Sequence, residues 1–166
     1  MSSTASSISA RQLYTALFLI CAALLAYALY TEHFQYLIPC ALCMTQRFFY
    51  VCLGVAALTA ALHNPDKIGR RAYVALMLLA SAGGIGTAGR QVWLQHLPED
   101  QVPACGPSLE YILDTLPLTE AFTTLMMGDG NCAEVQWTFL SLSMPTWSLI
   151  WFVVLGVAAL ASLKLR

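Results

Sequence analysis

Long runs of apolar residues alternate with short polar stretches along the whole chain. Four runs are long enough to cross a membrane: residues 13–30, 43–62, 72–89 and 147–163. Apart from Arg47, near the start of the second run, they contain no charged side chain. Each approaches the roughly 20 residues that cross about 30 Å of hydrocarbon, where the backbone has to satisfy its own hydrogen bonds. The pattern therefore predicts an all-α membrane protein, a four-transmembrane-helix bundle that forms one domain over residues 1–166.

Positive charge is distributed unevenly among the polar segments. Six of the eight lysine and arginine residues lie near one set of span ends: Arg11, Lys67, Arg70, Arg71, Lys164 and Arg166. The positive-inside rule makes that side cytoplasmic. We therefore expect residues 1–12, 63–71 and 164–166, with both termini, in the cytoplasm. Residues 31–47 and 90–146 are expected on the opposite, periplasmic side.

The composition agrees with a membrane protein. Hydrophobic residues make up 58% of the chain and charged residues 10%, whereas about 25% of a soluble domain is charged. The net charge of −1 gives no reason to expect a nucleic-acid partner. The motif Ala26-Tyr27-Ala28 resembles a signal-peptide cleavage site, but its apolar run is longer than a signal core and three spans follow. We expect this first run to be retained as a span.

The long polar segment, residues 90–146, contains two stretches with the period of an amphipathic helix. The apolar residues of the first are Leu109, Ile112, Leu113 and Leu116, and those of the second are Leu118, Phe122, Leu125 and Met126. Pro117 separates them, because proline interrupts a helix. We expect a long periplasmic loop whose short helices lie flat in the membrane interface. Binding of a partner is the alternative role.

Four of the six cysteines fall outside the predicted cytoplasmic side: Cys40, Cys43, Cys105 and Cys132. An oxidising compartment favours two disulfides among them, and the sequence allows three ways of pairing four cysteines. The other two cysteines lie within spans and are expected to be small packing residues.

Cys40 and Cys43 form a Cys-x-x-Cys pair at the start of the second span. A disulfide across two residues closes a small ring, so it gains little loop-closure entropy and is a poor structural staple. The exposed N–H groups of a helix N-terminus favour a thiolate at Cys43. A redox pair is therefore favoured over a metal site or a structural bond, and no metal is expected because further ligands are scattered.

Arg47, one turn further along, could stabilise that thiolate or bind an acceptor at the membrane edge; a snorkelling interfacial arginine is the alternative.

Cys105 and Cys132 lie in the long loop, both within turn-rich sequence. A bond between them would enclose about 27 residues and stabilise the fold by about 3.5 kcal/mol on the chain-entropy model. The bond could be a structural staple or could take part in turnover, and its energy does not decide between them.

Three motifs, taken together, resemble the bacterial disulfide bond formation protein B family. They are "PCALCMTQR", "GRQVWLQHLP" followed by "ACGPSLEYIL", and "GDGNCAEVQWTFLSLSMPTW". The resemblance implies a four-helix bundle of the bacterial inner membrane that works as a protein-dithiol:quinone oxidoreductase. It would reoxidise a soluble periplasmic thioredoxin-fold dithiol oxidase and pass the electrons to membrane quinone, either ubiquinone or menaquinone.

The resemblance also implies roles for individual residues. Cys105 would be attacked by the partner's thiolate, with Cys132 as its resolving mate and Cys105–Cys132 as one disulfide. Cys40 and Cys43 would form the other disulfide, and Cys40 would exchange with the loop pair through a transient bond to Cys132. Cys43 would face the quinone, and Arg47 would hold the quinone and favour the charged sulfur.

Two positions depart from the family pattern. Gln46 stands where an acid can occur, and Gln91 stands where a histidine can lie near the quinone. Gln91 or Arg90 is thus the candidate replacement for that contact. A vitamin K epoxide reductase-like oxidoreductase and a disulfide-stapled scaffold without turnover are the two alternative functions.

Overall fold

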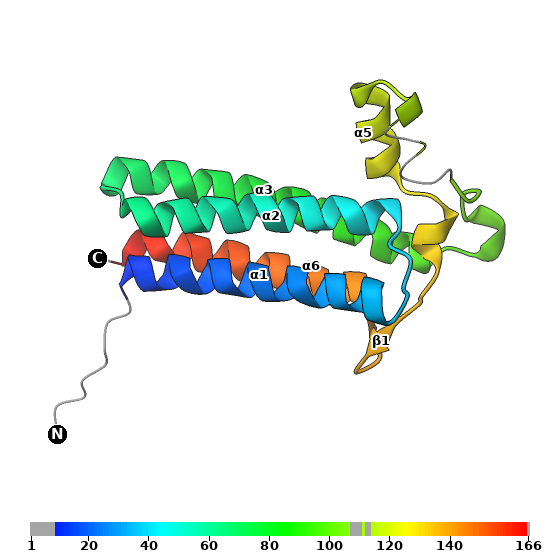
Figure 1. The fold of residues 1–166 in the computed structure, drawn as a ribbon, viewed down its shortest axis with the longest axis horizontal. Coiled ribbons are helices and arrows are strands. Elements are labelled where there is room, and N and C mark those ends of the chain that lie inside the picture. The colour runs from blue at the N-terminus through cyan, green and yellow to red at the C-terminus, as the bar shows by residue number, and fades with distance from the viewer. Residues whose placement is uncertain (1–8, 107–110, 112–113, 166) are drawn as a thin grey trace.

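The computed structural model describes residues 9–106, 111 and 114–165. Four long helices run alongside one another as a bundle, and the first residues of α1 lie at the same end as the last residues of α6 (Figure 1). The helices are α1 (Ala10–Phe34), α2 (Ala41–His63), α3 (Lys67–Gln95) and α6 (Met144–Ala161). Among the described residues, these four are long and apolar enough to cross a membrane. The all-α, four-helix membrane fold expected from the sequence is confirmed.

The helix ends follow from local sequence. Ser9 caps α1 by accepting a hydrogen bond from the backbone of Gln12, whose side chain accepts one from Ser9 in return. Asn64 ends α2 in the left-handed conformation, with φ of 44°, and Asp66 caps α3 two residues later. Pro145 lies in the first turn of α6, where its missing N–H removes no helical bond. Each apolar run therefore becomes one helix, and α6 continues into a short 3₁₀ turn.

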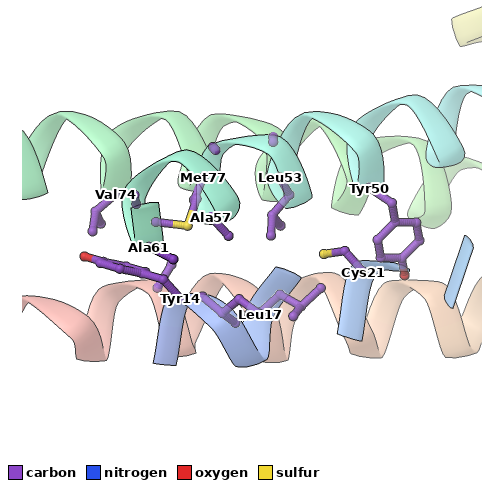
Figure 2. Packing of buried hydrophobic residues seen from close by; sticks show 14 of the residues in the cluster. Tyr14, Leu17, Cys21, Tyr50, Leu53, Ala57, Ala61, Val74 and Met77 are labelled. Carbon is purple, nitrogen blue, oxygen red and sulfur yellow. The ribbon is translucent and has the colours of Figure 1, made fainter. Parts of the chain in front are cut away.

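The bundle core combines large apolar side chains with small ones. Figure 2 shows Leu17 of α1 facing Leu53 and Ala57 of α2, with Met77 of α3 close by; all four are buried. Small residues let the helices approach one another closely. A Cβ added at Gly84, for example, would lie 2.3 Å from the ring of Phe152. Many large apolar side chains remain exposed on the outer faces of the bundle, as expected of helices that contact lipid.

The segment between α3 and α6 gathers at the end of the bundle away from the start of α1 (Figure 1). Its elements in order are η1 (Glu99–Gln101), α5 (Leu118–Met127), η2 (Gly130–Ala133), β1 (Thr138–Phe139) and β2 (Leu142–Ser143). Helix α5 confirms the second amphipathic helix predicted after Pro117. The first falls largely outside the described residues. The loop therefore forms a cap over one end of the bundle, next to the N-terminus of α2.

The strands β1 and β2 form a short antiparallel hairpin that the sequence analysis did not foresee. Its turn consists of Leu140 and Ser141, which have φ of 50° and 63°. A tight hairpin needs this left-handed conformation, which sequence usually signals with asparagine or glycine. Leucine and serine carry no such signal, so the hairpin was not predictable.

Candidate active site

Cys40 and Cys43 lie at the N-terminus of α2, on the capped end of the bundle. Cys40 is the N-cap residue, and its Sγ accepts a hydrogen bond from the backbone N–H of Cys43 at 3.4 Å. The two Sγ atoms are 2.8 Å apart. All six cysteines are free thiols in this structure, so the pairings Cys40–Cys43 and Cys105–Cys132 stay predictions. The Cys-x-x-Cys spacing places both sulfurs in the first turn of the helix.

Cys132 lies against the same pair. The turn η2 packs on α2 and α3, and Cys132 is fully buried there in a small apolar cluster with Cys40, Leu42 and Leu94. Cys40 hydrogen-bonds to both Cys132 and Cys43. Three sulfurs thus come together, with Cys40 in the middle.

These contacts shift the pKa values of Cys40 and Cys132 in opposite directions. The hydrogen bonds that Cys40 makes to Cys132 and Cys43, together with burial, raise its pKa above the usual thiol range. The bond from Cys40 lowers the pKa of Cys132, and backbone hydrogen bonds from Leu42 and Asp129 act in the same direction. Of Cys40 and Cys132, Cys132 is therefore the thiol that ionises more readily and is better able to attack a disulfide.

Cys105 is exposed, but its segment is attached to that of Cys132. The backbone N–H of Gly130 donates to the carbonyl of Ala104 at 3.2 Å. A Cβ at Gly130 would lie 2.5 Å from the carbonyl oxygen of Pro103, so only glycine permits this approach. The structure therefore presents Cys105 to solvent beside the turn that buries Cys132.

Gln91 of α3 lies between the two sulfurs of the Cys-x-x-Cys pair. Its Nε2 is 3.3 Å from the Sγ of Cys40 and 3.3 Å from that of Cys43. Its Oε1 accepts a hydrogen bond from Nε2 of Gln46 at 2.7 Å. Both glutamines are buried. Arg90, the other candidate at this position, donates instead to the carbonyl of Met127 and stacks over a tryptophan ring.

Arg47 also lies at this end of α2, and it forms an ion pair with Glu32 of α1. Its Nη2 donates to the carbonyl of Ala28 at 3.2 Å, and its Nη1 lies 3.6 Å from the Met44 sulfur. These contacts fix the guanidinium between the two helices. The sequence analysis identified Arg47 but not its acidic partner.

A cavity of about 510 Å³ opens beside these groups. Cys43, Gln46, Arg47 and Gln91 supply polar atoms to its wall. The rest of the wall is largely apolar and aromatic: Leu24, Leu25, Tyr27, Tyr50, Trp137, Phe139, Trp147 and Trp151. Size and lining are those of a site for a largely apolar small molecule whose polar groups meet Cys43 and Arg47.

The sequence model described as "Disulfide bond formation protein DsbB" matches residues 10–162. The chain belongs to this family. It is 48% identical over 152 residues to disulfide bond formation protein B of Marinobacter nauticus, covering 92% of this chain and 90% of that protein. It is 49% identical over 143 residues to the protein of the same name from Hahella chejuensis, covering 86% and 87%. Disulfide bond formation protein B 1 of Pseudomonas aeruginosa is 46% identical over 145 residues, covering 87% and 89%.

Within this disulfide bond formation protein B family member, the structure brings together five of the six residues singled out from the sequence: Cys40, Cys43, Cys132, Arg47 and Gln91. Cys105, the sixth, is presented to solvent. Because the chain belongs to this family, the alternative function as a vitamin K epoxide reductase-like oxidoreductase is set aside. The sequence analysis missed Gln46 as a site residue, although a glutamine one turn after Cys43 in an apolar helix was a signal of a buried polar contact.

Proposed function

We propose that this protein oxidises the dithiol of a soluble thioredoxin-fold oxidase and passes the two electrons to a membrane quinone, thereby sustaining disulfide formation in exported proteins. The observation that carries the proposal is the row of three sulfurs, Cys132, Cys40 and Cys43, which ends at an apolar cavity. One end of the row meets the loop that bears exposed Cys105. The other end meets a space suited to an apolar electron acceptor.

The exchange steps follow from this order. A thiolate of the soluble partner attacks Cys105 of a Cys105–Cys132 disulfide, forms a mixed disulfide and releases Cys132 as a thiolate. Cys132 then attacks Cys40, the Cys40–Cys43 bond breaks, and its electron pair stays on Cys43. Cys132 is suited to the attack because the backbone hydrogen bonds from Leu42 and Asp129 lower its pKa, and these bonds do not need a free Cys40 thiol.

The residues around the cavity fit a quinone head group. The cavity volume of about 510 Å³ is within the range of small-molecule sites. Aromatic side chains form much of the wall, which also includes Cys43 and the hydrogen-bond donor Arg47. A bound quinone would supply the two-electron acceptor for the Cys43 thiolate. Ubiquinone and menaquinone both satisfy this chemistry.

The proposed location is the bacterial inner membrane, with the sulfur row at the periplasmic face and both termini in the cytoplasm. Among the described residues, five cations lie towards the bundle end opposite the row, namely Arg11, Lys67, Arg70, Arg71 and Lys164, which supports this orientation. Reporter fusions after Arg166 and within residues 64–69 should behave as cytoplasmic. A periplasmic signal from either fusion would reverse the orientation and remove the cysteines from the oxidising side.

The function is tested with the purified protein in lipid discs, a reduced thioredoxin-fold dithiol protein and a soluble quinone. We expect one quinone reduced for each dithiol oxidised, followed by quinone absorbance and by thiol titration of the partner. Cys43→Ser and Cys132→Ser should each abolish turnover. Absence of quinone reduction by the unmodified protein would contradict the proposal and favour a disulfide-stapled scaffold.

A further inference from the structure

The amide of Gln91 is placed to donate to two sulfurs at once. Nε2 carries two hydrogens, and it lies at 3.3 Å from both Cys40 Sγ and Cys43 Sγ. Gln91 is only 3% exposed, so water has little access to compete for these hydrogens. A thiolate can only accept hydrogen bonds, so ionisation of either sulfur favours this orientation of the amide.

Gln46 determines which way that amide faces. Its Nε2 donates to Gln91 Oε1 at 2.7 Å, a shorter contact than either sulfur bond, and Gln46 is itself 5% exposed. If the Gln91 amide turned over, two NH₂ groups would face each other across this distance. The donor from α2 therefore keeps the NH₂ group of Gln91 directed at the Cys-x-x-Cys pair.

A donor is needed at this point because the proposed exchange leaves a negative sulfur in a buried site. Burying a charge without a hydrogen-bond partner is costly. The nearby cation, Arg47, makes hydrogen bonds to Glu32 and to the carbonyl of Ala28. An uncharged amide is thus the group in direct contact with the sulfurs, and unlike a histidine it keeps its donors at every pH.

We propose that Gln91 is a catalytic residue whose N–H groups stabilise the Cys43 thiolate as Cys132 displaces it from Cys40, and that Gln46 is the positioning residue that orients the Gln91 amide. In this step the Cys132–Cys40 bond forms, the Cys40–Cys43 bond breaks, and the electron pair remains on Cys43. Gln91 donates hydrogen bonds and loses no proton. The inference rests on the proposed exchange function but concerns a property of the sulfurs that is measurable without quinone or partner.

The test is the rate at which iodoacetamide alkylates Cys43 in the reduced protein, measured between pH 5 and 9 by peptide mass spectrometry. Gln91→Met keeps an unbranched, uncharged side chain but removes the donors. A hydrogen bond to a charged group is stronger than one to a neutral group, so we expect the pH profile of alkylation to shift upward by about one unit or more. At pH 7 that corresponds to about 10-fold slower alkylation or more.

Gln46→Met should produce a smaller shift in the same direction. Because Gln46 acts through Gln91, the double variant should be no slower than Gln91→Met alone, a non-additivity that independent structural damage would not produce. Gln95→Met is the matched control, since Gln95 lies one turn further along α3 and accepts from the Ser143 hydroxyl. Its Cys43 profile should match that of the unmodified protein.

Cys21 reports on folding in the same samples, because it is buried in the bundle core and should stay unmodified in every variant. An unchanged Cys43 profile in Gln91→Met, with Cys21 protected, would overturn the inference. So would additive effects of the two glutamine substitutions. If the unmodified protein failed to reduce quinone while Gln91→Met shifted the profile, the proposed function would fail, and stabilisation of the Cys43 thiolate by Gln91 would still stand.

Discussion

Replacement of Arg47 by lysine separates two roles for this side chain, because lysine keeps the charge but lacks the planar, multi-donor guanidinium. Arg47 reaches two acceptors of α1 at once, the carboxylate of Glu32 through Nη1 and the carbonyl of Ala28 through Nη2. A single ammonium placed at Glu32 would not reproduce this fork. Since Glu32 already balances the charge of Arg47, we expect the apparent KM for quinone to depend more on the geometry of the guanidinium than on its charge.

The expected magnitude follows from the surroundings of the pair. The Arg47 and Glu32 side chains are 18% and 29% exposed, so solvent screens the ion pair, and the pair itself is worth about 1 kcal/mol or less. A directed hydrogen bond from a charged donor to a ligand in the adjoining cavity is worth about 1.5–3 kcal/mol. Losing one such bond should raise the apparent KM for a soluble quinone by roughly 10- to 150-fold.

The assay measures initial rates of quinone reduction against quinone concentration for Arg47→Lys and Arg47→Gln. Both should show the raised KM, and alkylation of Cys43 in the lysine variant should keep its normal pH profile. Arg90→Lys is the matched control, because Arg90 bonds to the carbonyl of Met127 and should leave KM unchanged. A normal KM in Arg47→Lys, with loss only in Arg47→Gln, would refute the positional role and leave charge as the explanation.

Three further outcomes are expected. Cys132→Ser, mixed with the oxidised form of the soluble partner, should accumulate a mixed disulfide on non-reducing gels, because the Cys105 thiolate attacks the partner's disulfide and Cys132 is no longer present to displace the partner from Cys105; trapping through Cys132 in a Cys105→Ser variant would reverse these roles. In the reduced protein Cys132 should ionise at pH values below the usual thiol range, because the hydrogen bond from Cys40 lowers its pKa, and Cys40→Ala should move that ionisation to higher pH; because Cys132 is fully buried, the ultraviolet absorbance of the thiolate is the measurement, and an unmoved profile would contradict that cause. Gly84→Ala should lower the free energy of unfolding by about 1–3 kcal/mol, measured by denaturation in detergent, whereas Gly86→Ala, with nothing within 4 Å of the added carbon, should not; equal effects would contradict the packing argument.

The helices were predictable because hydrocarbon imposes a simple rule on sequence. A run of apolar residues such as 147–163 has one stable backbone in lipid, so its helix can be read directly from the chain. The proximity of Cys40 and Cys43 was equally predictable, because they are only three residues apart and one helical turn brings them together.

The contacts between helices were not predictable in this way. Gln46 and Gln91 are 45 residues apart, and their meeting depends on the rotation of α2 and α3 about their own axes. The ion pair between Arg47 and Glu32 depends in the same way on how α1 packs. The position of Cys132 against Cys40 depends on the path of the long loop, which local sequence does not determine.

The unequal exposure of the two loop cysteines has a consequence for selectivity. Cys105 faces solvent, whereas Cys132 and Cys40 are buried beneath the loop and Cys43 lines the apolar cavity. Among these four cysteines, Cys105 is therefore the one that small thiols in the surrounding water meet most readily, whereas Cys132 and Cys40 are covered by the loop. Under the proposed function, this burial would limit the loss of oxidising equivalents to small thiols in solution and would favour a protein that stays docked long enough for Cys132 to complete the exchange.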